Sequence, residues 1–229
     1  MDKIKTTIGF LMMLSAFIVS EKAAVFIVYI FAAAIHEAGH LIAAKALKIK
    51  IKGIGFDYSG LRIHIDEKMT AYTSEIVLAA AGPIFNALSA GVGYFILKNH
   101  FVDSGYFFEE VTKFISAGEP SPIGSSGFFI VASCVQAAIN LLPIKTFDGG
   151  RMLYCMLATI YEEETAEKVL SFTSSVFAFI LWIVSLYLML KLSRGLGIYI
   201  FATSIFAISL KDKNRYDHKE NIKIKAKFH

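Results

Sequence analysis

Long apolar segments recur along this chain, and they constrain its fold more than any other feature. They cover residues 6–20, 23–47, 71–97, 126–142, 169–190 and 195–210. About 20 consecutive apolar residues are enough for a helix to span the hydrocarbon core of a bilayer. Because hydrophobic residues make up 55% of the 229 positions, the chain has room for several spans but for no large soluble domain. We expect an α-helical polytopic membrane protein with about six transmembrane helices.

The connection between the second and third segments has a different periodicity. Apolar and polar residues alternate over residues 49–52 and again over residues 61–65. Tyr58-Ser59-Gly60, which lies between them, is typical of a turn. The pattern predicts a small β-hairpin or sheet between spans two and three.

Lysine and arginine predict how the chain is oriented. Residues 45–70 contain six of them, whereas residues 98–125 contain two. Positively charged loops favour the cytoplasmic side, so both termini of a six-span chain in the cell membrane are predicted to be cytoplasmic. Residues 1–210 would form the membrane domain and residues 211–229 a basic cytoplasmic tail. The net charge of +4 comes with no basic face interleaved with aromatic residues, so nucleic-acid binding is not predicted.

A candidate metal site lies in the second apolar segment, where residues 36–40 read H-E-A-G-H. Histidines four residues apart lie on nearly the same face of a helix. In the pattern H-E-x-x-H, both imidazoles bind one zinc ion and the glutamate acts as a general base. The alternative is a structural polar cluster, but ionisable side chains within a membrane are costly and usually functional. The motif therefore indicates a metalloprotease whose active site lies within the membrane.

A catalytic zinc ion needs a third protein ligand, and Asp148 is the preferred candidate. The metzincin extension of the motif fails, because Ala43 and Ala46 occupy the positions of its glycine and histidine. Glu75, a glutamate of the kind used in thermolysin-like sites, lies near the end of a segment. Asp148 follows the inward-running fourth segment and precedes two glycines, which allow close backbone approach. An aspartate at this position can also cap the following helix, so spacing alone leaves both roles open.

Three motifs occur in order in spans two to four. They are H-E-A-G-H at 36–40, A-G-P-I-F-N at 81–86 and N-x-x-P-x-x-x-x-D-G at 140–149. Together they resemble the site-2 protease family. The resemblance implies an intramembrane zinc endopeptidase acting in the bilayer on membrane proteins, at or near their transmembrane segments, such as transcription-factor precursors or anti-sigma factors. It also implies His36, His40 and Asp148 as zinc ligands and Glu37 as the catalytic acid and base.

The predicted span number is similar to that of the compact subgroup containing the sporulation protease that processes a sigma-factor precursor. Two features depart from the family pattern. Phe147 stands where the family usually has leucine, which is an apolar exchange. The region after Leu210 is too short for the nucleotide-sensing CBS domain of that subgroup, so regulation by ATP through such a domain is not predicted.

Two asparagines are predicted to bind substrate. Gly82-Pro83 is expected to break span three, and Asn86 lies one turn farther on, whereas Asn140 begins the third motif. Either amide can hold the substrate backbone or orient the oxyanion, and hydrogen bonding between helices is the alternative for both. The predicted hairpin offers an edge to which an unwound substrate can add as a strand.

Two other functions compete with proteolysis. A catalytically silent protein that binds membrane clients is expected to lack the glutamate of H-E-x-x-H, which is present here as Glu37. A metal transporter is expected to show internal repeats, and the sequence has none.

Overall fold

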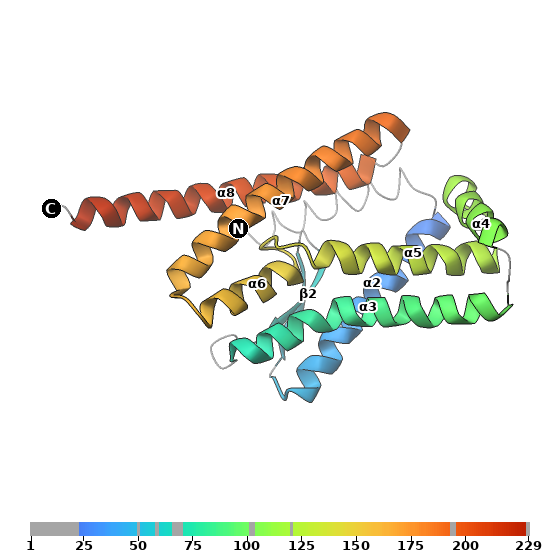
Figure 1. The fold of residues 1–229 in the computed structure, drawn as a ribbon, viewed down its shortest axis with the longest axis horizontal. Helices are drawn as coiled ribbons and strands as arrows, with labels where there is room; N and C mark the ends of the chain where they lie inside the picture. The colour runs from blue at the N-terminus through green and yellow to red at the C-terminus, as the bar shows by residue number, and fades with distance from the viewer. Residues whose placement is uncertain are drawn as a thin grey trace.

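The structure is a computed structural model that describes most of the chain (Figure 1). The described ranges are 23–49, 51–57, 60–65, 71–100, 104–119, 121–192 and 196–227. Within them the elements are α2 (Ala23–Ala46), β1 (Ile51–Asp57), β2 (Gly60–Ile65), α3 (Tyr72–His100), α4 (Ser104–Ala117), α5 (Pro122–Asn140), α6 (Asp148–Ala158), α7 (Glu163–Leu192) and α8 (Leu196–Lys227). The predicted first span, residues 6–20, lies outside the described residues.

Four of the described helices are long and apolar enough to cross a membrane. They are Ala23–Ala46, Tyr72–Lys98, Pro122–Asn140 and Glu163–Lys191, which correspond to the predicted second to fifth spans. Large apolar side chains on them, such as Phe31 and Phe95, are exposed, as expected for helices that face lipid. The chain is thus a helical polytopic membrane protein. The sixth predicted span lies within α8, which is not among these four helices, so the number of six stays a prediction.

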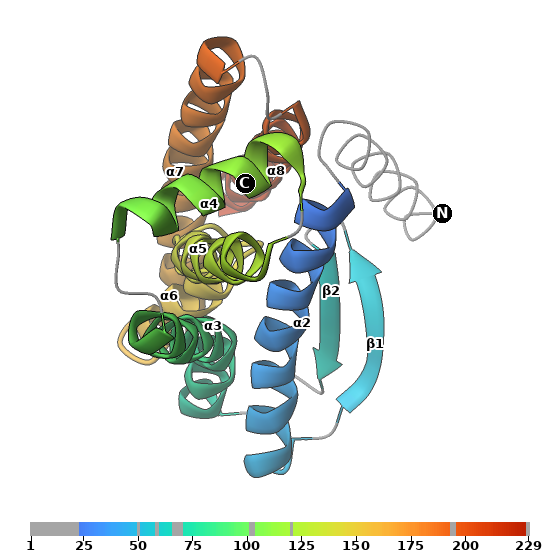
Figure 2. The ribbon, with the colours of Figure 1, turned by 90° about the vertical axis from the view of Figure 1, so that its right-hand side faces the viewer.

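The helices α2, α3 and α5 pack against one another and form the centre of the fold (Figure 2). α2 and α3 approach closely at Gly39, where a Cβ atom would lie 2.7 Å from the carbonyl oxygen of Ala81. α4 packs on α5, α6 lies between α3 and α7, and α8 runs along α7. α6 therefore connects the three-helix centre to the α7–α8 pair.

The two strands pair antiparallel, from Ile51 opposite Ile65 to Asp57 opposite Gly60. They lie where the alternating residues predicted a hairpin, although residues 58–59 of the predicted turn lie outside the described ranges. β2 contacts α2, and Figure 2 shows both strands on the side of α2 that faces away from α3. The sheet thus flanks the helix that carries H-E-x-x-H.

The expected break in span three is wrong, because α3 continues as one helix with Pro83 inside it. Proline removes one backbone hydrogen bond and crowds the preceding turn, which usually ends or kinks a helix. In a membrane protein, neighbouring helices can hold such a segment helical. Here Gly82 faces side chains of α2 and Asn86 contacts Gln136 of α5, so tertiary contacts on both sides of Pro83 outweigh the local preference.

The loop between α5 and α6 is held in the core, although it has no regular structure. Ile144 and Phe147 are buried against Ala178 of α7 and Ile205 of α8. The backbone N–H of Lys145 donates a hydrogen bond of 2.8 Å to the hydroxyl of a serine on α7. Since the loop leads directly into Asp148, these contacts determine where α6 begins.

Candidate metal site

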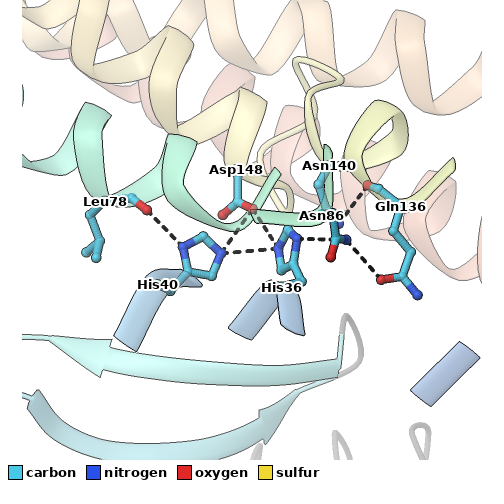
Figure 3. A network of polar contacts seen from close by, with 7 residues as sticks. All are labelled: His36, His40, Leu78, Asn86, Gln136, Asn140 and Asp148. Atoms are coloured by element: carbon cyan, nitrogen blue, oxygen red, sulfur yellow. Dashed lines mark hydrogen bonds and ion pairs between the residues drawn. The ribbon is translucent and has the colours of Figure 1, made fainter. Parts of the chain in front are cut away.

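Two buried histidines on α2 begin the site. His36 and His40 lie one turn apart, as the motif predicted, and both rings point from α2 toward α3 and α6 (Figure 3). Their ring centroids are 4.8 Å apart and the rings are nearly perpendicular. Their Nε2 atoms lie only 3.1 Å apart, so both nitrogens face one point in space.

Asp148 completes a triangle with the two histidines, although it lies 112 residues from His36. Its Oδ2 atom is 3.0 Å from Nε2 of His36 and 3.2 Å from Nε2 of His40. The three ligand-type atoms are therefore almost equidistant. Two imidazoles and one carboxylate form a donor set typical of a catalytic zinc site that keeps its fourth position open.

The size of this triangle fits a small tetrahedral ion. Ligand atoms about 2.0–2.1 Å from zinc lie about 3.3–3.4 Å from one another in a tetrahedron. The observed sides of 3.0, 3.1 and 3.2 Å are close to that spacing. The atoms need to separate by only a few tenths of an ångström to bind such an ion, so the residues present fit the metal.

Gly82 of α3 leaves the space in which these nitrogens lie. A Cβ atom at this position would be 2.6 Å from Nε2 of His36 and still closer to Nε2 of His40. Any other residue would therefore overlap the two ligand atoms. Gly82, the glycine of the second motif, is thus part of the site because it has no side chain to overlap the imidazoles.

A hydrogen bond orients His40. Its Nδ1–H donates to the carbonyl oxygen of Leu78 on α3, at 2.8 Å. Because a carbonyl only accepts, the proton of the neutral ring is on Nδ1 and the lone pair of Nε2 faces the triangle. This is the tautomer that metal ligation requires.

Glu37 lies between the histidines in sequence but outside the triangle. It is half-buried, and its carboxylate belongs with the two imidazoles to a group whose ligand-type atoms all lie within 4.8 Å of one another. The distances above place Asp148 in direct contact with both histidine nitrogens. Glu37 is therefore near the candidate metal position, where a proton-transferring group would be needed.

The start of α6 brings Asp148 to the histidines. Phe147 is the N-cap residue of this helix and makes no capping bond with its side chain, whereas the Asp148 carboxylate contacts the imidazoles. Gly149 and Gly150 pack directly on backbone carbonyls of Leu141 and Ile144, where a Cβ atom would overlap them. The close approach expected of the two glycines is present, and it positions the aspartate.

Glu75 is engaged elsewhere. Both Nε and a terminal nitrogen of Arg151 donate to its Oε2 atom at 3.3 Å, which joins α3 to α6. This ion pair lies one helical turn from Leu78 on α3 and one turn from Asp148 on α6. It connects the two helices that contact the histidines from the same side.

Of the two predicted substrate-binding asparagines, the structure brings Asn86 into contact with a histidine of the triangle and Asn140 into contact with Gln136 of its own helix. Asn86 is fully buried, and its Nδ2 atom lies 3.2 Å from Oε1 of Gln136 and 3.4 Å from Nδ1 of His36. These are contacts between helices, the alternative that the sequence left open. Asn140 is half-buried and donates to the Gln136 carbonyl of its own helix at 3.0 Å. Sequence reasoning missed Gln136, although a glutamine in an apolar segment was a usable signal.

Comparisons with known proteins show the family of this chain. The sequence model of peptidase family M50 matches residues 23–184 of the chain, and this range includes all three motifs. The chain belongs to peptidase family M50. This is the site-2 protease family, so the M50 protein is an intramembrane metalloprotease of the site-2 type.

A solved structure is similar to the M50 protein in fold. The Site-2 Protease from Methanocaldococcus jannaschii superposes with a TM-score of 0.62 at 20% sequence identity. The match covers 90% of this chain and 88% of the archaeal one. At this identity the similarity shows a shared fold. A search of curated proteins gives no significant match.

Proposed function

We propose that this M50 protein is a zinc endopeptidase that hydrolyses peptide bonds in or near transmembrane segments of other membrane proteins. The observation that carries the proposal is the contact of one Asp148 oxygen with both histidine nitrogens. Two imidazoles and a carboxylate suit zinc, and hydrolysis needs the fourth position of that ion. By the distribution of lysine and arginine, the site lies in the cytoplasmic half of the membrane and both termini are cytoplasmic.

Each residue of the site has a distinct role in this proposal. His36, His40 and Asp148 hold the metal. When bound, a zinc ion polarises the scissile carbonyl and lowers the pKa of a water molecule toward ~7. Glu37 accepts the proton of the attacking water and transfers it to the leaving amine. The carbonyl of Leu78 keeps His40 in its ligating tautomer throughout.

The substrate must lose its helical structure before it can be cut, because a helix holds each peptide group in an internal hydrogen bond. The sheet of β1 and β2 flanks α2, the helix that carries the histidines. Among the described residues the sheet has two strands, and an unwound substrate segment can add to one of its edges through backbone hydrogen bonds. Asn140, which is half-buried, is the better placed of the two asparagines to contact that segment.

The test compares wild-type protein with Glu37→Gln on co-expressed single-span membrane proteins. Glutamine keeps the shape of the side chain but cannot accept the proton, so cleavage should be lost while zinc content stays at the wild-type level. Cleavage by the Glu37→Gln variant would remove Glu37 from its role.

The competing functions give different results in the same system. A silent client-binding protein would capture the single-span protein in its wild-type form and leave it intact. A transporter would move Zn²⁺ into proteoliposomes without proteolysis. Either result would contradict the proposed peptidase activity.

A further inference from the structure

One helix supplies partners to both histidines at regular intervals. On α3, Leu78, Gly82 and Asn86 follow one another at four-residue spacing and therefore lie along one face of the helix. The Leu78 carbonyl accepts from Nδ1 of His40, and Gly82 faces both Nε2 atoms. Asn86 occupies the corresponding position at Nδ1 of His36 (Figure 3). The two histidines are thus contacted at their outer nitrogens by the same helix.

The side chain of Asn86 contacts two other helices, α5 through Gln136 and α2 through His36. Its Nδ2 atom donates to Oε1 of Gln136 on α5 at 3.2 Å. The Nε2 of Gln136 in turn donates to the backbone carbonyl of Tyr29 on α2 at 3.1 Å. Asn86 is fully buried, so substrate and bulk water do not reach it. Its surroundings suit a residue that orients a neighbour.

His36 needs an acceptor at the nitrogen that Asn86 contacts. A neutral imidazole that uses Nε2 as a ligand carries its proton on Nδ1, and such N–H groups almost always donate to an oxygen. Among the described residues, Asn86 is the one in contact with Nδ1 of His36. Asn86 also has a buried Oδ1 atom without a hydrogen-bond partner in the described part of the chain.

The Oδ1 atom of Asn86 lacks a hydrogen-bond partner, and Nδ1–H of His36 requires an acceptor. Both observations concern the side-chain amide of Asn86. The oxygen and nitrogen ends of a carboxamide are nearly identical in shape, so a half-turn interchanges them without needing more space. This rotation of the amide replaces the hydrogen bond from Nδ2 of Asn86 to Oε1 of Gln136 by one from Nδ1–H of His36 to Oδ1 of Asn86. The buried oxygen gains a partner, while Nδ2 of Asn86 and Oε1 of Gln136 lose the bond between them, so the exchange follows from the need of a ligating His36 for an acceptor at Nδ1.

We infer that Asn86 is a positioning residue for His36, whose side-chain oxygen accepts a hydrogen bond from Nδ1–H of the ligating ring. This inference rests on the proposed role of His36, His40 and Asp148 as zinc ligands. Asn86 keeps Nε2 of His36 directed at the other two ligands, as the Leu78 carbonyl does for His40. Asn86 acts on the metal only through His36 and contacts neither substrate nor ion.

The experiment measures Zn²⁺ affinity of purified protein in detergent micelles, after removal of metal, by competition with a chromophoric chelator. Asn86→Leu has the same branched side-chain skeleton but no acceptor, and we expect its affinity to fall by about 10- to 100-fold. Asn86→Asp keeps an oxygen toward Nδ1 and should retain affinity close to that of the wild type. Asn86→Ala serves as a second removal variant where leucine prevents folding.

A matched control is available on α5. Ser133 is fully buried and its hydroxyl has no partner in the described part of the chain, so Ser133→Ala changes a buried polar group that makes no hydrogen bond to either imidazole. Its Zn²⁺ affinity should be unchanged. A general effect of altering buried polar groups would instead lower affinity in this variant as well, and would overturn the specific role of Asn86.

The outcomes separate the inference from the function on which it rests. Wild-type affinity in Asn86→Leu or Asn86→Ala would overturn the positioning role. Affinity as low in Asn86→Asp as in Asn86→Leu would show that an acceptor oxygen is not what His36 needs, which also overturns it. If wild-type protein and His36→Ala bound Zn²⁺ equally, the proposed metal site itself would fail.

Discussion

The close approach of Gly82 to the histidines provides the sharpest test of the metal site. The perturbation is Gly82→Ala, which adds a single carbon atom to α3. That atom would lie 2.6 Å from Nε2 of His36 and closer still to Nε2 of His40. Carbon atoms and their neighbours normally pack at about 3.5–4.0 Å, so the rings must retreat by about 1 Å.

A displacement of this size is large compared with what metal coordination tolerates. Ligand distances in functional sites lie within about ±0.2 Å of their ideal values. With either imidazole displaced, the triangle with Asp148 no longer fits a tetrahedral ion. We expect Zn²⁺ affinity to fall at least ~100-fold, which corresponds to about 2.8 kcal/mol of binding free energy.

The assay is zinc content of the purified protein by elemental analysis, together with Zn²⁺ titration and cleavage of a single-span substrate. Gly91→Ala is the matched control, because it lies on the same helix and a Cβ atom there meets nothing within 4 Å. Alanine should stabilise the helix at this position by roughly 0.5–1 kcal/mol and leave zinc unaffected. Wild-type zinc affinity in Gly82→Ala would refute the argument that this face of α3 shapes the metal site.

Three further predictions concern the rest of the site. Asp148→Ala should lower zinc content and abolish cleavage, because it removes one vertex of the triangle; full zinc occupancy by elemental analysis would exclude Asp148 as a ligand. Either Glu75→Arg or Arg151→Glu alone should weaken Zn²⁺ binding by separating α3 from α6, and the double exchange should restore it in the same titration, whereas no recovery would mean that the pair does not position these helices. Proline at Ile63, in the middle of β2, should reduce cleavage far more than zinc content, because it disrupts the sheet rather than the ligands; equal loss of both would indicate misfolding.

The sequence by itself determined the features that depend on local periodicity. The apolar segments predicted α2, α3, α5 and α7, because the lipid-spanning length of a helix is set by its own residues. The pairing of His36 with His40 was equally predictable, since four-residue spacing places both rings on one face of any helix. The alternating residues predicted β2 and the start of β1, but β1 continues to Asp57, beyond the alternation at 49–52.

The contacts between site residues on different helices depended on tertiary packing. The sequence predicted Asp148 near the histidines but left a ligand role and a capping role open; it contacts them because Ile144 and Phe147 anchor the preceding loop between α7 and α8. The same holds for α3, where packing between α2 and α5 keeps Pro83 inside a continuous helix.

The alignment of α3 with α2 was also decided in three dimensions. Spacing along α3 could show that Leu78, Gly82 and Asn86 share a face, but not that this face meets His36 and His40. That depends on how the two helices cross, and Gly39 allows the close approach of α2 to the backbone of α3. Local sequence thus determined which residues can act together on one helix, while packing between helices decided which of them surround the metal position, because contacts between distant segments form only when the whole fold is in place.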